Sequence, residues 1–287
     1  MRKKIIIFFE LKVISNLIIL AAIVAMEAKM KLTTVLYRVE NNVAIITMDR
    51  KDAMNALNKQ LFDELATAFE TAKSDETVRA VILAGEGRCF CAGGDIAEIH
   101  ALQTEEAIEK FFASADTLMK LLGNFPKPVI AAAHGAIAGA GTSLLLSCDM
   151  AIIADNAKFV VAFGAVGLVP DCGLHYLLPR FVGLSRAKEM MLTQRVVKAD
   201  ELLELGIANK VTPEDELMTT ATALATKIAN GPLNAYALSK SLFNKYAEVD
   251  FEQMLHEELS AQMLARLHDN GTEGLTAFIE KRPAKFK

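Results

Sequence analysis

The sequence predicts an α/β fold in which strand–helix repeats come first and a helical region follows. Short apolar runs rich in β-branched residues alternate with segments of helical period through the first half of the chain, and helical patterns dominate from Leu177 onward. Of the 287 residues, 52% are hydrophobic, so the chain can bury a large core. We therefore expect one α/β domain with a helical C-terminal region.

The predicted elements form two successive cycles. Two strands at Val35–Val39 and Val43–Met48 are joined by the turn Asn41-Asn42, a hairpin signal. The first cycle continues with a helix at Asn58–Lys73, a strand at Val78–Ala84 and a loop at Gly85–Gly94. The second has a helix at Glu105–Leu122, a strand at Val129–Ala133, a small-residue loop at Gly135–Gly141, a helix at Thr142–Ser147 and strands at Met150–Ala154 and Lys158–Val161. After the loop Gly167–Gly173, helices are expected at Ala187–Leu192, Ala199–Glu204, Glu214–Ala229 and Phe251–Leu267.

Composition excludes some classes of function. The formal net charge is −4, and no long basic run occurs after the first four residues, which argues against a nucleic-acid-binding surface. The four cysteines form no C-x-x-C pair and have no metal-ligand spacing. We therefore expect reduced interior thiols, no metal site and a cytoplasmic protein.

The first 30 residues differ from the rest. Met1–Lys4 is basic, whereas Ile5–Phe9 and most of Val13–Met26 are apolar. Both apolar stretches are shorter than the roughly 17–25 residues that span a bilayer. The favoured interpretation is that translation starts at Met26 or Met30; a membrane-associating segment through residues 5–26 and a signal peptide are the alternatives. We treat residues 1–30 as an N-terminal extension.

Two glycine-rich segments each follow a predicted strand. In Cys91–Ile96, Asp95 is placed to cap a helix that begins at Ile96. Glycines there and in Gly135–Gly141 let a ligand atom approach a peptide N–H without a Cβ in the way. The first segment alone also fits an ordinary strand–turn–helix connection, and the second alone also fits tight helix–strand packing. Two such segments in successive cycles can direct two N–H donors at one oxyanion, such as that of a thioester enolate.

A third segment, Val169-Pro170-Asp171-Cys172-Gly173, contains an acidic residue in a Pro/Gly loop. Such an aspartate is often a turn residue whose carboxylate binds nearby main chain. The alternative is an acid/base in apolar surroundings, where desolvation would raise its pKa. These residues alone leave both interpretations open.

Five motifs occur in a characteristic order: R-K-D-A-M-N-A-L (50–57), C-F-C-A-G-G-D-I (89–96), H-G-A-I-A-G-A-G (134–141), P-D-C-G (170–173) and E-K-R-P-A-K-F (280–286). Together they closely resemble the enoyl-CoA hydratase/isomerase (crotonase) superfamily. The resemblance implies a crotonase-type spiral of repeated ββα units at residues 31–200 and a helical trimerisation region at 201–287. It also implies an acyl-CoA substrate, a homotrimer or dimer of trimers, and no cofactor beyond the coenzyme A moiety.

The resemblance also implies roles for individual residues. The oxyanion donors fall on the N–H groups of Gly94 and Ala140. Coenzyme A is expected to lie against two segments, with contacts from Ala53, Asn55, Leu57, Ala92, Asp95 and Ile96. Lys281 matches a C-terminal lysine that often reaches the nucleotide end of coenzyme A, although a solvated surface lysine is an alternative.

Departures from the pattern of the superfamily narrow the predicted reaction. Its hydratases carry two catalytic glutamates, and the matching positions here are Ser143 and Phe163. Asp171 aligns instead with the acidic residue of several isomerases and of the aryl-CoA dehalogenases. We therefore predict an enoyl-CoA isomerase with Asp171 as acid/base. The alternatives are a hydratase-like enzyme lacking the usual glutamates, a dehalogenase or hydrolase with Asp171 as nucleophile, and a non-catalytic acyl-CoA-binding protein.

Overall fold

The computed structural model describes residues 32–287, and Thr34–Lys287 form one compact unit. The N-terminal extension at 1–30, its possible alternative starts and the possible membrane contact through residues 5–26 lie outside the described residues. Across residues 32–287, no helix has both the length and the apolar composition needed to cross a bilayer.

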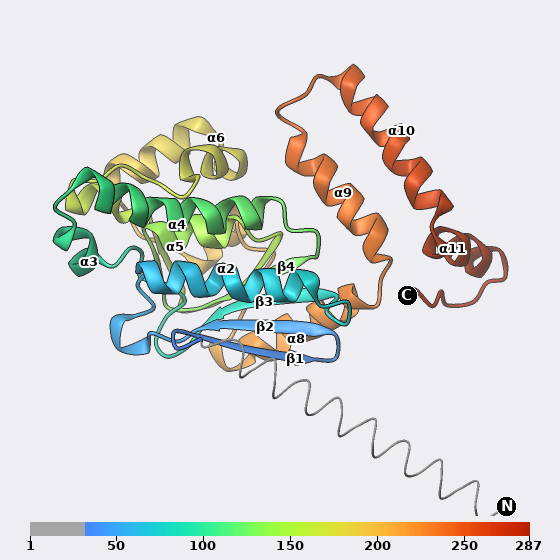
Figure 1. The fold of residues 1–287 in the computed structure, drawn as a ribbon, viewed down its shortest axis with the longest axis horizontal. Helices are drawn as coiled ribbons and strands as arrows, with labels where there is room; N and C mark the ends of the chain where they lie inside the picture. Colours follow the sequence, from blue (N-terminus) through green and yellow to red (C-terminus); the bar gives the residue numbers. More distant parts are fainter. Residues whose placement is uncertain (1–31) are drawn as a thin grey trace, which may run out of the picture. The chain divides into compact units, whose positions relative to one another are not determined.

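A six-stranded sheet forms the centre of this unit (Figure 1). Its order is β1 (Val35–Glu40), β2 (Val43–Met48), β3 (Ala80–Gly85), β4 (Val129–Ala133), β6 (Met150–Ala154) and β9 (Lys210–Thr212). β1 and β2 are antiparallel, as the Asn41-Asn42 turn predicts, and both asparagines have positive φ (50° and 65°). The other pairs are parallel. Because both faces of the central strands are covered, their sequences are almost continuously apolar.

Helices cover the sheet from both sides. In Figure 1, α2 (Lys59–Ser74) and α4 (Glu105–Gly123) lie on one face and α8 (Leu217–Ala229) on the other. The α8 residues Leu217, Ala221, Ala225 and Ala229 recur every four positions and pack into a buried cluster with β2, β3, β4 and β6. The mostly small side chains on this stripe let α8 approach the sheet closely.

A smaller sheet forms a second layer, with the order β5 (Ala136–Ala138), β7 (Lys158–Val160) and β8 (Val197–Lys198). Two isolated parallel bridges extend it, Cys91 with Ile137 and Leu57 with Gly94. After β3, β4 and β6 the chain passes in turn to Cys91–Gly94, β5 and β7, so successive repeats add one segment to each layer. This winding is the predicted spiral. The expectation of a loop throughout Gly135–Gly141 is wrong for β5, because small residues carry little strand propensity.

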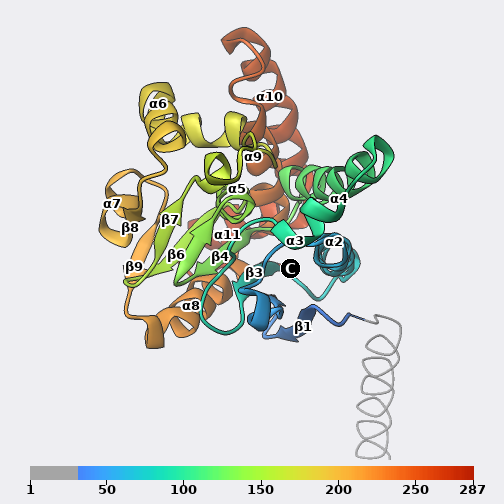
Figure 2. The same ribbon diagram turned by 90° about the vertical axis from the view of Figure 1, so that its left-hand side faces the viewer.

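The remaining elements are all helices. They are η1 (Lys51–Ala53), α3 (Ile96–Ala101), α5 (Ala140–Leu146), η2 (Ala162–Val166), α6 (Leu174–Thr193), α7 (Ala199–Glu204), η3 (Glu214–Glu216), α9 (Leu233–Lys245), α10 (Phe251–Leu267) and α11 (Asp269–Ile279). Figure 2 shows α5 beside the small sheet, between α6 and β4. On α9, Lys240 Nζ lies 2.7 Å from Asp149 Oδ2, which also accepts the Val129 N–H at 2.7 Å. This contact anchors the predicted C-terminal helical region on the sheet.

Candidate active site

The first glycine loop leaves one N–H without a partner. The Leu57 N–H donates to Gly93 O at 2.7 Å, and the Asp95 N–H donates to Leu57 O at 2.9 Å. Gly94 lies between these two bonds, and because successive N–H groups of an extended segment point to opposite sides, its own N–H points away from Leu57. Among residues 32–287, none accepts a hydrogen bond from the Gly94 N–H.

The second glycine loop leads into α5. Gly139 has φ 50°, and its carbonyl accepts the N–H of Thr142 at 2.9 Å and the Thr142 hydroxyl at 2.6 Å. The helix begins at Ala140, two residues before the predicted start at Thr142. Ala140 is therefore the first helical residue, whose N–H has no carbonyl available within the helix. No acceptor for it occurs in the described part of the chain.

The fold places these two loops against each other. The Cys91 N–H donates to Ala136 O at 3.1 Å, and the Ala138 N–H donates to Cys91 O at 2.9 Å. A Cβ added to Gly93 would lie 3.0 Å from Ala138 O, and one added to Gly139 would lie 3.4 Å from the Gly93 Cα. The structure thus brings together the loops of the two predicted oxyanion donors, which is why glycines are needed at the contact.

Asp171 lies in the loop between η2 and α6. Its Oδ1 atom is buried and has no hydrogen-bond partner in the described part of the chain. Burial raises the pKa of the Asp171 carboxyl above its ordinary value, although a hydrogen bond with the Cys172 thiol lowers it in part. The charge of Asp116, on α4, also raises this pKa. Asp171 therefore has the free carboxylate oxygen and the environment expected of a general base.

The two positions that match the hydratase glutamates are both buried. Ser143 is 0% exposed on α5, and its hydroxyl donates to the main-chain oxygen of Asp171 at 3.0 Å. Phe163 is 7% exposed in η2. The Ser143 bond shows that the Asp171 loop contacts α5, the helix that begins at Ala140.

An ion pair joins the two segments predicted to hold coenzyme A. Arg50 Nη2 lies 2.9 Å from Asp95 Oδ2, and the Arg50 guanidinium also donates to Ala56 O. Burial alone would raise the pKa of the Asp95 carboxyl, but the hydrogen bond from Arg50 holds it below its ordinary value. Asp95 also accepts the Glu98 N–H at 3.2 Å, which confirms it as the cap of α3.

Asn55 holds the first of these segments in place. Its Nδ2 donates to three carbonyls, those of Glu86 and Cys89 at 2.9 Å and that of Phe90 at 3.2 Å, while its Oδ1 accepts the Arg50 N–H at 2.9 Å. The side chain is 0% exposed, so it offers no surface to coenzyme A. The Asn55 side chain therefore supports the segment predicted to hold coenzyme A and has no exposed surface with which to contact it.

The other predicted contacts divide by exposure. Ala53, Ala92 and Asp95 are partly exposed and Ile96 is 49% exposed. Leu57 is 1% exposed, and its N–H and carbonyl are both paired with the first glycine loop. Lys281 is exposed, and its N–H donates to Phe278 O at the end of α11. Figure 1 shows α11 and α3 at opposite ends of the unit Thr34–Lys287.

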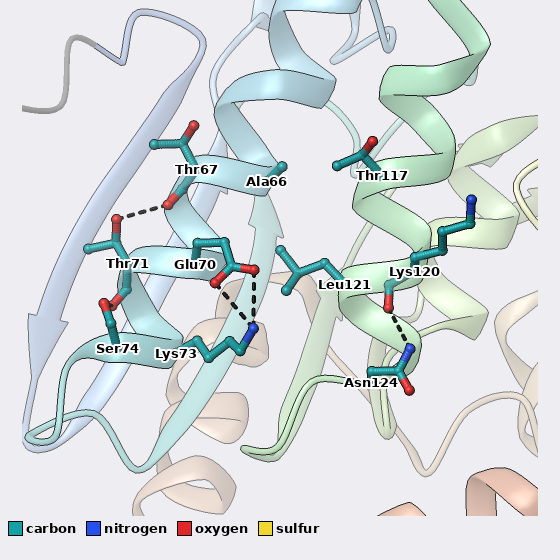
Figure 3. A pocket seen from close by; sticks show the side chains of 10 residues that line it. All are labelled: Ala66, Thr67, Glu70, Thr71, Lys73, Ser74, Thr117, Lys120, Leu121 and Asn124. Carbon is teal, nitrogen blue, oxygen red and sulfur yellow. Dashed lines mark hydrogen bonds and ion pairs between the residues drawn. The ribbon is translucent and has the colours of Figure 1, made fainter.

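A separate hollow of about 790 Å³ lies between the C-terminal halves of α2 and α4 (Figure 3). Its lining includes Glu70, Lys73, Thr117, Lys120 and Asn124, and none of the predicted site residues. Lys73 is paired with Glu70 at 3.2 Å.

The fold and the paired glycine loops define a crotonase-type domain. The family model described as enoyl-CoA hydratase/isomerase matches residues 38–287. The chain belongs to the enoyl-CoA hydratase/isomerase family.

Among individual relatives, some are named isomerases and others hydratases. The chain is 35% identical over 258 residues to the 1,2-epoxyphenylacetyl-CoA isomerase of Escherichia coli (strain K12), covering 88% of this chain and 97% of that protein. It is 36% identical over 254 residues, with the same coverage, to the short-chain-enoyl-CoA hydratase of Clostridium acetobutylicum. A crystal structure of an enoyl-CoA hydratase from Polaromonas sp. JS666 superposes with a TM-score of 0.86 at 31% identity, covering 88% and 99% of the two chains. Membership therefore leaves the reaction open between isomerisation and hydration.

Proposed function

We propose that this enzyme is an enoyl-CoA isomerase that moves a double bond from C3 to C2, with Asp171 as acid/base. The observation that supports this proposal most is the buried, unpartnered Oδ1 of Asp171 in a loop that contacts α5. Hydration needs a group that activates water, and Ser143 and Phe163 stand where the hydratase glutamates would be. Isomerisation needs only one base and a stabilised enolate.

In the proposed reaction the thioester oxygen accepts hydrogen bonds from the main-chain N–H groups of Gly94 and Ala140. Preorganised donors of this kind are worth about 3–4 kcal/mol each in the transition state. Asp171 takes a proton from C2, the dienolate is held by the two donors, and the protonated carboxyl returns the proton at C4. Coenzyme A lies against the partly exposed segment that includes Ala92 and Ile96, and no cofactor beyond this moiety takes part.

The test is a panel of 3-enoyl-CoA and 2-enoyl-CoA thioesters of increasing chain length, assayed for both isomerisation and hydration. We expect conversion of 3-enoyl-CoA to 2-enoyl-CoA to exceed hydration for every thioester that turns over. Faster hydration would identify a hydratase. A covalent adduct in the intact mass after substrate trapping would instead indicate a nucleophilic Asp171, and coenzyme A binding without any turnover would indicate a binding protein.

We also propose that the enzyme is a homotrimer or a dimer of trimers. The helices α10 and α11 expose large apolar side chains to solvent, including Leu259 (61%), Met263 (58%) and Phe278 (85%). Monomers rarely leave a large apolar surface uncovered, so this region fits an interface between copies. Light scattering should give a particle of three or six chain masses in dilute buffer, and a monomer mass would contradict the proposal.

We propose a cytoplasmic location because the cysteines are free thiols. Cys89, Cys91, Cys148 and Cys172 are all buried free thiols. Thiols without disulfide partners are typical of reducing compartments. Fractionation of native cells, with blotting of each fraction, would test this location.

A further inference from the structure

Ser143 links the two halves of the candidate active site. It lies one helical turn after Ala140 on α5 and is 0% exposed. Its hydroxyl donates to the main-chain oxygen of Asp171 at 3.0 Å, across 28 residues of sequence. One hydroxyl thus connects the helix of an oxyanion donor to the loop of the proposed base.

The Asp171 loop has little other support. Cys172 and Gly173 follow with left-handed φ values of 52° and 77°, and Val169 before it is 77% exposed. The Asp171 carbonyl also accepts the Leu174 N–H at 3.0 Å, from the first residue of α6. Within residues 32–287, the Ser143 bond is the one hydrogen bond that ties positions 167–173 to an element other than η2 and α6.

The position of this bond matters for proton transfer. The base must reach C2 and C4 of a substrate whose thioester oxygen is held by the Ala140 and Gly94 donors. An error of about 1 Å in such a geometry can cost about 100-fold in rate. Because Ser143 and Ala140 share one buried helix, a bond from Ser143 fixes the loop relative to the donor.

We propose that Ser143 is a positioning residue that sets the distance between Asp171 and the oxyanion donors, an inference that rests on the proposed isomerase function. At this position a hydratase glutamate would handle water. Here the buried Ser143 hydroxyl instead donates a hydrogen bond to the main-chain oxygen of Asp171, so the residue at this position holds the proposed base in place. Ser143 acts through its bond to the Asp171 backbone.

The test compares Ser143→Ala and Ser143→Thr with Ser147→Ala, a matched control. Ser147 lies just after the same helix, and its hydroxyl donates to Ser143 O at 2.8 Å without contacting the Asp171 loop. For 3-enoyl-CoA isomerisation, Ser143→Ala should lower kcat by about 10- to 100-fold with little change in KM. Ser143→Thr keeps the hydroxyl and should recover much of kcat, and Ser147→Ala should behave as wild type.

The pH profile gives a second readout. Besides burial, two titratable groups shift the pKa of the Asp171 carboxyl: Cys172 in its own loop, which lowers it, and Asp116 on α4, which raises it. A loosened loop lets water reach the carboxylate and relieves its desolvation, so the acidic limb of kcat should move to lower pH in Ser143→Ala. Amide hydrogen exchange of peptides covering residues 167–173 should become faster in Ser143→Ala and stay unchanged in Ser147→Ala.

Unchanged kcat, pH limb and exchange in Ser143→Ala would overturn the inference. A second result would also overturn it: Ser143→Ala lowers both kcat and the melting temperature, and Ser143→Thr restores neither. That result would indicate that Ser143 contributes only to packing. Asp171→Asn distinguishes a failure of the proposed base from a failure of the Ser143 inference. If that variant keeps wild-type kcat, the base assignment fails and the Ser143 inference with it; if only Ser143→Ala is silent, the Ser143 inference fails and the base assignment stands.

Discussion

Asp171→Asn is expected to lower kcat for isomerisation by about 1,000-fold, with KM changed little. A positioned general base contributes about 10²–10⁴-fold, so this loss corresponds to about 4 kcal/mol of barrier. The asparagine keeps the size of the side chain but cannot take the C2 proton. Steady-state kinetics with 3-enoyl-CoA at neutral pH measure the effect, and equal rates in the two proteins would refute the mechanism.

The pH dependence follows from the same group. Asp171 is a base only when ionised, so the wild-type rate should fall as pH drops through the pKa of its carboxyl, which burial raises above 3.8. A raised pKa in the folded state means that ionisation costs stability, and this cost appears as pH rises through that pKa. Asp171→Asn should therefore melt at a higher temperature than wild type at neutral pH, with the difference vanishing below the ordinary carboxyl pKa. A lower melting temperature at neutral pH would show that the ionised carboxylate has stabilising partners.

Ala140→Pro is expected to lower kcat by about 10²–10³-fold, because it removes one of the two N–H donors to the enolate oxygen. Ala140 is the first residue of α5, a position that tolerates proline since its N–H has no role within the helix. The preceding residue is Gly139, which has no Cβ to clash with the proline ring. Isomerisation kinetics measure the loss.

Ala140→Gly is the matched control, because it keeps the N–H and should retain kcat close to wild type. Circular dichroism and thermal unfolding of Ala140→Pro show whether α5 survives the substitution. A folded proline variant with wild-type kcat would remove Ala140 from the oxyanion hole.

Much of the fold could be predicted because buried strands have a distinctive composition. Strands β2 and β4 are buried on both faces and, apart from Thr47 in β2, apolar, and their predicted bounds match the structure. β5 was missed because Ala136–Ala138 is short and mostly alanine. Its conformation depends on pairing with β7 and Cys91, which local sequence does not encode.

The candidate site, like the fold, has features that the sequence predicts and features that it does not. The glycines mark the two loops in the sequence, because Gly93 and Gly139 lie where the two backbones approach closely. The assignment of the donors to Gly94 and Ala140 within these loops rests on the resemblance to the superfamily. Three supporting interactions could not be predicted: the Arg50–Asp95 ion pair, the hydrogen bonds of Asn55 and the Ser143–Asp171 bond. Each joins residues far apart in sequence, so only the folded chain reveals the pairing.

The winding of the chain between two layers affects how such a protein can diverge. The proposed donors at Gly94 and Ala140 are main-chain groups in loops that are held by bridges between neighbouring turns of the spiral. Point mutations that spare the backbone leave these amides in place. The proposed acid/base, Asp171, is in contrast a single side chain on a loop outside both layers. In the proposed mechanism, a change of reaction therefore needs only new side chains on this loop, while the main-chain donors to the thioester oxygen stay the same.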